Sequence, residues 1–150
     1  MERLTQPLYD YPPAAIMPSI VRNCLNSLWL TNLQGVDGFL YNLFIRGSAG
    51  EEYWCIQTWD DDCYDLGFEA PFDGYACMLF TPGIDDQWEY EIISESILMS
   101  YLAIGIDAKI KLNGWSVDDA LKLAQKYRIP WPQKKSVVTR LADYLAKKRQ

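Results

Sequence analysis

The chain has 150 residues, 49% of them hydrophobic and 23% charged, and a formal net charge of −6 at pH 7. This length is typical of a single domain with one core, and the composition lies far from that of disordered chains. Histidine is absent, which excludes the usual Ser-His-Asp and Cys-His catalytic mechanisms and histidine-based zinc sites. We therefore expect residues 1–150 to form one folded domain without the chemistry of the common hydrolases.

The first residues are expected to form an extended arm. Residues 1–17 contain Pro7, Pro12 and Pro13, and proline fixes its own φ and disfavours a helical conformation in the residue before it. The N-terminus shows no basic segment followed by an apolar one, and no apolar run approaches the roughly 20 residues that cross a bilayer. These patterns predict a cytoplasmic protein that does not contact the membrane.

A helix and then a sheet are predicted for the first half of the chain. Apolar residues recur at helical spacing from Ser19 to about Gln34, and Gly35 follows as a stop signal. Three runs rich in aromatic and long apolar residues then predict antiparallel strands: Phe39–Arg46, Tyr53–Trp59 and Tyr75–Thr81. The glycine-containing segment 47–52 is expected to connect the first two strands as a hairpin.

Helices are predicted for the remainder of the chain. Their expected ranges are Trp88–Ile104, Val117–Arg128 after the N-cap residue Ser116, and Ser136–Arg149. The fold class is therefore α+β. We expect a small antiparallel sheet of three or four strands packed with about four helices, in the order α-β-β-β-α-α-α.

The four cysteines are expected to be free thiols. Cys24, Cys55, Cys63 and Cys77 match no CxxC pair and no spacing of a secreted disulfide scaffold. Cys55 and Cys77 lie inside apolar runs, where cysteine behaves as a small buried hydrophobic residue. No cofactor is expected either, because the sequence contains neither GxxxxGK[ST] nor GxGxxG.

Charge is strongly segregated along the chain. Residues 47–108 contain fourteen acidic residues and no lysine or arginine, whereas residues 109–150 contain eleven basic and three acidic residues. Such asymmetry bears on partners and association rates rather than on the fold. Two arrangements are consistent with it: the basic tail folds back over the acidic segment, or part of the acidic surface stays open and recruits a basic protein.

The 15-residue connection Asp60–Gly74 is long for a hairpin loop and is the candidate functional segment. Carboxylates pair with arginine, aromatic ring faces attract cations, and aromatic residues are enriched in interface hot spots. Of the aromatic side chains next to its aspartates, Trp59, Tyr64 and Phe68 are expected to be exposed. The predicted partner-binding residues are Trp59, Asp60, Asp61, Asp62, Tyr64, Asp65, Phe68, Glu69, Phe72 and Asp73.

Two other uses of the charged residues are less well supported. The aspartates at 60, 61, 62 and 65 have the oxygen ligands that Mg²⁺ and Ca²⁺ prefer, but Asp65 occupies the position that an EF-hand reserves for glycine. No metal site is therefore predicted, and a carboxylate-dependent or metal-dependent hydrolase is an alternative. The basic C-terminal segment suggests phosphate contacts, but a sequence pI of about 4.6 argues against binding nucleic acid.

This physical profile resembles small acidic inhibitors, such as immunity proteins of bacterial toxin systems, antitoxins and phage-encoded inhibitors of nucleases. The resemblance implies a non-catalytic protein that blocks the basic active-site cleft of a nuclease-type toxin or of another enzyme that binds nucleic acid. A structural adaptor or assembly subunit, which would use the charge asymmetry for head-to-tail contact, is the alternative.

Overall fold

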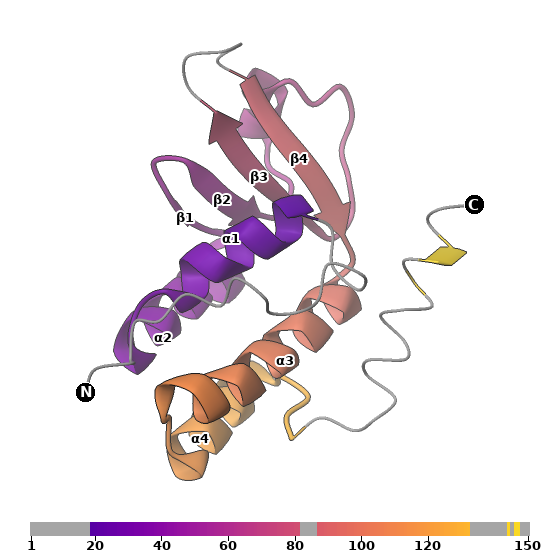
Figure 1. Ribbon diagram of the computed structural model, residues 1–150. Coiled ribbons are helices and arrows are strands. Elements are labelled where there is room, and N and C mark those ends of the chain that lie inside the picture. The colour runs from indigo at the N-terminus through magenta and orange to yellow at the C-terminus, as the bar shows by residue number, and fades with distance from the viewer. Residues whose placement is uncertain (1–18, 82–86, 133–143, 145, 148–150) are drawn as a thin grey trace.

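The computed structural model of the chain describes residues 19–81, 87–132, 144, 146 and 147. These residues confirm the α+β class, with an antiparallel sheet in the strand order β1-β2-β3-β4 (Figure 1). The elements in chain order are α1 (Ser19–Trp29), α2 (Leu33–Tyr41), the π-helical turn η1 (Asn42–Arg46), β1 (Ser48–Glu51), β2 (Trp54–Gln57), the 3-10 helix η2 (Asp61–Leu66), β3 (Tyr75–Thr81), β4 (Gln87–Ile93), α3 (Glu95–Asn113) and α4 (Val117–Tyr127).

The sheet is a meander in which each strand pairs with the next one along the chain. Side chains alternate between its two faces, as in any β-strand. In β3, Tyr75 and Cys77 face the main core, whereas Ala76 and Met78 belong to a second, smaller cluster on the opposite face. Both faces of β3 are therefore buried, which explains why its sequence is almost continuously apolar.

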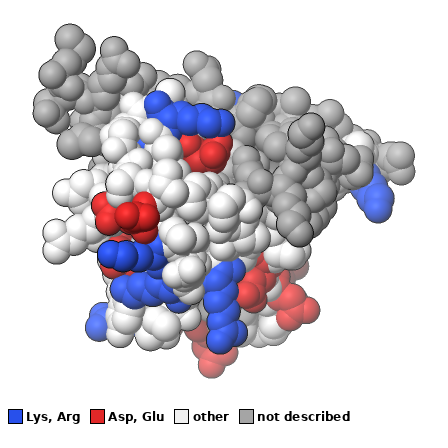
Figure 2. Space-filling model, turned by 90° about the horizontal axis from the view of Figure 1, so that it is seen from below, with Lys and Arg blue, Asp and Glu red and all other residues white. Residues whose placement is uncertain are grey.

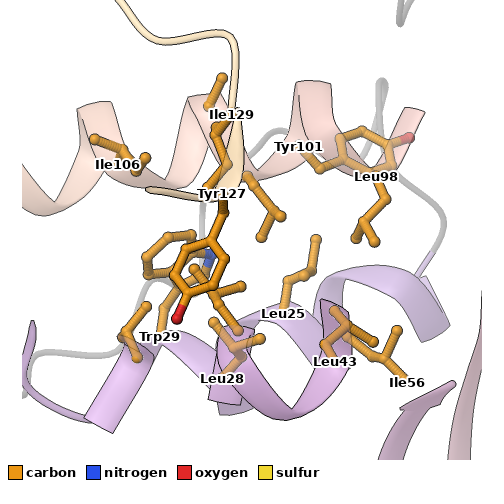
Figure 3. Close-up of a cluster of buried hydrophobic side chains, with 14 of the residues drawn as sticks. Leu25, Leu28, Trp29, Leu43, Ile56, Leu98, Tyr101, Ile106, Tyr127 and Ile129 are labelled. Carbon is orange, nitrogen blue, oxygen red and sulfur yellow. The ribbon is translucent and has the colours of Figure 1, made fainter. Parts of the chain in front are cut away.

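The main core lies between the sheet and the helices, and α1 is at its centre. On one side of α1, the Cys24 thiol donates a hydrogen bond to the Met78 carbonyl oxygen of β3, with an S···O distance of 3.3 Å. On another side, the Trp29 ring packs directly against Gly105 of α3. Figure 3 shows side chains of α1 and α3 meeting in this core, among them Leu25, Leu28 and Tyr101.

Helix α4 is joined to α2 by a polar contact at the edge of the core. Lys126 Nζ lies 2.9 and 3.1 Å from the two carboxylate oxygens of Asp37. The Tyr127 hydroxyl donates to the Asp37 carbonyl oxygen at 3.0 Å and also contacts the Asp37 carboxylate. Together these contacts position α4 on the first half of the chain.

The predicted strand Phe39–Arg46 is wrong, because this segment is helical. Asn32 lies between α1 and α2 and is the N-cap of α2. Its side chain accepts a hydrogen bond from the Gly35 amide at 2.9 Å. Val36, Leu40 and Leu43 are all buried, and their spacing of four and three residues suits one face of a helix. Packing of this face outweighs the β-propensity of the aromatic residues between them.

The predicted helix Trp88–Ile104 combines a strand and a helix. Residues 87–93 form β4, and α3 begins only after Ser94, whose hydroxyl accepts a hydrogen bond from the Ile97 amide at 3.3 Å. The predicted hairpin connection 47–52 is also mostly strand, since Ser48–Glu51 forms β1 and pairs with β2. The element order is consequently α-α-β-β-β-β-α-α rather than the expected one.

Other predictions have mixed outcomes. Strand Tyr75–Thr81 and the capping of α4 by Ser116 are confirmed, and all four cysteines are free. The extended arm 1–17 lies outside the described residues, as does nearly all of the predicted last helix from 136 to 149. None of the described helices is long and apolar enough to cross a membrane.

Candidate functional site

The connection between β2 and β3 folds over the sheet face that α1 leaves uncovered. Cys63 and Phe68, which come from this connection, are buried against Ala76 and Met78 of β3. The connection is therefore held on the sheet by a small apolar cluster of its own. Its acidic residues occupy the outer side of this cover.

Local hydrogen bonds shape the start of the connection. Asp60 has an extended backbone, and its carboxylate accepts a hydrogen bond from the Asp62 amide at 3.0 Å, which caps the helix η2. Gly67 ends η2 with a φ of 100°, a left-handed conformation that glycine adopts at little cost. Asp61, Asp62 and Asp65 thus lie on an ordered helical turn.

A buried polar contact links the connection to β2. Gln57 Nε2 donates to the Cys63 sulfur at 3.1 Å, and the Cys55 thiol donates to Gln57 Oε1 at 3.5 Å. Burial raises the pKa of the Cys55 thiol to about 11. Because only the thiolate is strongly nucleophilic, Cys55 is a packing and hydrogen-bonding residue at neutral pH.

The aromatic side chains of the connection form one continuous group. Trp59 contacts Tyr64 and Phe72 nearly edge-on, with ring centroids 4.8 and 5.5 Å apart. Phe68 packs against Phe72 and against Tyr90 of β4, at 5.0 and 4.4 Å. Such contacts hold the rings in fixed orientations.

Exposure differs widely among these rings. Tyr64 is 50% exposed, as predicted, and Trp59 and Phe72 are half-buried. Phe68 is only 6% exposed, so its predicted exposure is wrong. Phe68 stabilises the connection from beneath, because the apolar residues of the second sheet face offer it a site of burial.

The predicted carboxylates all reach solvent. We define the acidic loop surface as the predicted partner-binding residues that are exposed or half-buried: Trp59, Asp60, Asp61, Asp62, Tyr64, Asp65, Glu69, Phe72 and Asp73. No lysine or arginine lies within this segment. Among the described residues, no three Cys, Asp or Glu side chains are grouped so that they could hold a metal ion.

A groove of about 550 Å³ borders the acidic loop surface. It lies where the connection returns to β3, beside the end of β4 and the start of α3. The residues that line it are Thr58, Trp59, Phe72, Asp73, Gly74, Tyr75, Ile92, Ile93, Ser94 and Glu95. Its walls therefore combine aromatic rings with the exposed carboxylates of Asp73 and Glu95.

Glu95 was not among the predicted site residues. It joins the site because Tyr75 pairs with Ile93 in the antiparallel register, which brings the end of β4 beside the start of β3. The signal in the sequence is Ser94, a residue type that favours helix N-caps, followed by Glu95 in the first turn of α3. Recognising this start of α3 would have required predicting β4 as a strand.

Charges are mixed on another face of the molecule. Figure 2 views the molecule from the side of α3 and α4 and shows Lys and Arg side chains interspersed with Asp and Glu. Two of the ion pairs are Lys126 with Asp37 and Lys111 with Asp107, the latter at 2.7 Å. In one of the two expected arrangements, the basic C-terminal helix folds over the acidic segment. Nearly all of this predicted helix lies outside the described residues, so the arrangement stays a prediction.

Comparison of the chain with protein-family models, with curated proteins and with solved structures found no match. What the fold defines is the class, an α+β protein with a four-stranded antiparallel meander. Function is therefore argued from the site alone, since a fold class hosts many functions.

Proposed function

We propose that this chain is a non-catalytic inhibitor that binds a basic protein through the acidic loop surface. In its most concrete form it is an immunity protein or antitoxin. It would then neutralise a nuclease-type toxin by occupying the active-site cleft that otherwise binds nucleic acid. An inhibitor of another enzyme that binds nucleic acid, including one encoded by a phage, would use the same contact.

One observation carries this proposal: six exposed carboxylates lie on a single connection that is packed onto the sheet and contains no basic residue. They are Asp60, Asp61, Asp62, Asp65, Glu69 and Asp73. A connection that is already ordered loses little conformational entropy on binding. The clustered charge supports selectivity for a basic surface.

The expected mechanism has two stages. The negative field of the loop steers a basic partner into an encounter complex, and such steering weakens as salt rises. The exposed ring of Tyr64 and the half-buried ring of Trp59 then dock as anchors, because tyrosine and tryptophan are enriched among hot spots. Blockade is steric and electrostatic, with no covalent step.

Charge reversal on the loop tests the proposal. Asp61, Asp62 and Asp65 are each replaced by lysine, while Asp60 is retained because its carboxylate caps η2. We expect the wild-type chain to retain a basic protein from native lysate and to inhibit the nuclease activity of that protein. The variant should neither retain this protein nor inhibit it. The control is Lys122→Glu on α4, an exposed position far along the chain from the loop.

The rate of association supplies a second readout. Stopped-flow measurements with the identified partner should show a rate constant that falls as ionic strength rises, by about tenfold or more between low and physiological salt for a strongly steered pair. A rate that does not change with salt, or full inhibition by the lysine variant, would contradict the proposal.

Self-assembly is the second candidate, and one feature of the sheet favours it. Strand β4 lies at the margin of the described sheet and is seven residues long, and edge strands can pair with another chain. A structural adaptor would then associate with itself. Light scattering over a range of concentration and salt separates the two functions, since only the adaptor would form oligomers without another protein.

A further inference from the structure

The groove beside the acidic loop surface has the features of a binding site for a single side chain. We propose that it binds an arginine side chain of the basic partner, with the guanidinium against the rings of Trp59 and Phe72. The carboxylates of Asp73 and Glu95 would balance its charge. This inference rests on the proposed function and specifies the chemistry that the partner presents to this part of the surface.

The aromatic wall of the groove is held in place before any ligand arrives. Trp59 is packed between Tyr64 and Phe72, with interplanar angles of 86° and 88°. Phe72 is in turn supported by the buried ring of Phe68. Guanidinium groups stack on aromatic faces, and a ring that is already fixed loses little freedom when one does so.

The base of the groove is shaped by a close approach of two backbones. Gly74 has a φ of 89°, and a Cβ at this position would overlap the Ile93 carbonyl and lie 3.2 Å from Ser94 Cα. The connection can therefore return to β3 directly beside the junction of β4 and α3. This return brings Asp73 and Glu95, which are far apart in the sequence, to the same groove.

The charge of the groove is entirely negative. Asp73 and Glu95 are both exposed, and no basic residue is among those that line the groove. Burial raises the pKa of Tyr75, and the charge of Glu95 raises it further, so this carboxylate interacts with one of the residues that line the groove. Two carboxylates at one groove suit the several N–H donors of a guanidinium.

The groove differs from other hollows in its charge. A hollow of about 610 Å³ that Tyr53 and Trp54 help to line has one carboxylate, Glu51, where the groove has two. The groove has a volume of about 550 Å³, which lies in the range of sites that enclose a small ligand. This volume is larger than one side chain needs, so the backbone next to the arginine also has room. The hollow between α2 and α4, of about 300 Å³, contains two acidic and two basic residues. One of its lysines, Lys126, is already paired with Asp37. The hollow between α2 and α4 therefore has no comparable preference for a cation.

Titration of the full chain with the peptide acetyl-Gly-Arg-Gly-amide tests the inference by NMR. We expect saturable shifts of the Trp59 indole resonance, assigned with Trp59→Phe, and of the Glu95 amide, with a dissociation constant on the order of 1 mM. Nuclear Overhauser contacts should join the arginine side chain to the Trp59 ring. The matching citrulline peptide, which has nearly the same shape but no charge, should not bind.

Matched variants localise the binding. Asp73→Asn combined with Glu95→Gln should weaken binding of the arginine peptide by about tenfold, because charge-assisted hydrogen bonds are lost. Asp65→Asn combined with Glu69→Gln removes the same charge outside the groove and should change affinity by less than about twofold at physiological salt. If the groove pair alters folding, Asp73→Asn alone gives the same comparison with Asp65→Asn.

The outcomes separate this inference from the proposed function. Equal weakening by both pairs, equal binding of the citrulline peptide, or the absence of saturable shifts would overturn the arginine site. Inhibition of the partner that survives loss of Asp73 and Glu95 but not charge reversal of the loop would overturn it as well, and would leave the proposed function intact. Peptide binding in the groove without any basic protein partner would support the site and contradict the function.

Discussion

Lys109 is a buried lysine of α3, and the described residues contain no carboxylate paired with it. Its Nζ donates a hydrogen bond to the Thr31 carbonyl oxygen at 3.4 Å and lies 5.7 Å from the centroid of the Trp115 ring. Burial lowers its pKa from 10.5 to about 8. The protonated form is therefore destabilised in the folded chain.

Lys109 by itself should consequently make the stability of the protein rise with pH between about 8 and 10. In this window the unfolded chain keeps the Lys109 proton more than the folded chain does, so raising the pH favours folding. From about pH 9 an opposite trend should set in, because burial raises the pKa of the Cys55 thiol from 9 to about 11, that of Tyr127 to about 12 and that of Tyr101 further still. These thiol and phenol groups ionise more readily when the chain is unfolded, so raising the pH then favours unfolding. Urea denaturation at a series of pH values measures both trends.

Replacing Lys109 with methionine tests the cause. We expect Lys109→Met to stabilise the fold by about 1–3 kcal/mol at pH 7, since an apolar side chain of similar length removes the cost of burying a charge. The rise in stability that Lys109 contributes between pH 8 and 10 should disappear in this variant, which leaves the fall that the Cys55 thiol causes from about pH 9. Lys122→Met, at an exposed position of α4, removes the same charge and should keep the rise. An unchanged pH profile in Lys109→Met would show that another group titrates.

At the scale of elements, two helical glycines should respond in opposite ways to alanine. A Cβ at Gly105 would overlap the Trp29 ring, so Gly105→Ala should cost about 1–3 kcal/mol through overpacking. A Cβ at Gly38 in α2 would meet no atom within 4 Å, so Gly38→Ala should stabilise the fold by about 0.5–1 kcal/mol. Thermal unfolding of both variants measures the difference. Equal effects would mean that α1 and α3 are not in close contact.

The connection between β2 and β3 supports a second comparison at this scale. Phe68→Ala should destabilise the protein by about 3–5 kcal/mol, because the ring is buried against the sheet. Tyr64→Ala, at a ring that is half exposed, should change stability by no more than about 0.5 kcal/mol. Tyr64→Ala should nevertheless weaken partner binding by about 2 kcal/mol if this ring is an anchor. Calorimetry of unfolding and of binding separates the two roles.

Elements that local sequence signals specify are predicted correctly, whereas elements that depend on packing are not. Ser116 and the aspartates after it indicate α4, and the apolar run of β3 is bounded by Gly74. Residues 39–46 have the composition of a strand, yet they are helical because one face is buried against the core. Residues 88–91 alternate between aromatic and acidic side chains, which is a strand pattern, but the spacing of Ile93 and Ile97 across the boundary suggested a helix.

For the molecule as a whole, charge segregation is a property of the sequence, whereas its display on a surface is a property of the fold. The acidic segment 47–108 contributes β1 to β4 and most of α3. Burial of Cys63 and Phe68 on the second face of the sheet turns the carboxylates of the connection outward. The same exposed charge that attracts a partner also repels itself, so added salt should stabilise the free chain while it slows association.

The sequence by itself determined the α+β class, the base-free acidic segment and the free thiols, because composition and local pattern decide them. It also indicated the carboxylates and rings of the acidic loop surface. Only the tertiary structure decided that Phe68 is buried, that β4 is a strand, and that Asp73 and Glu95 border one groove. These features depend on contacts between residues far apart in the chain, such as the pairing of Tyr75 with Ile93, and no local signal specifies such a pairing.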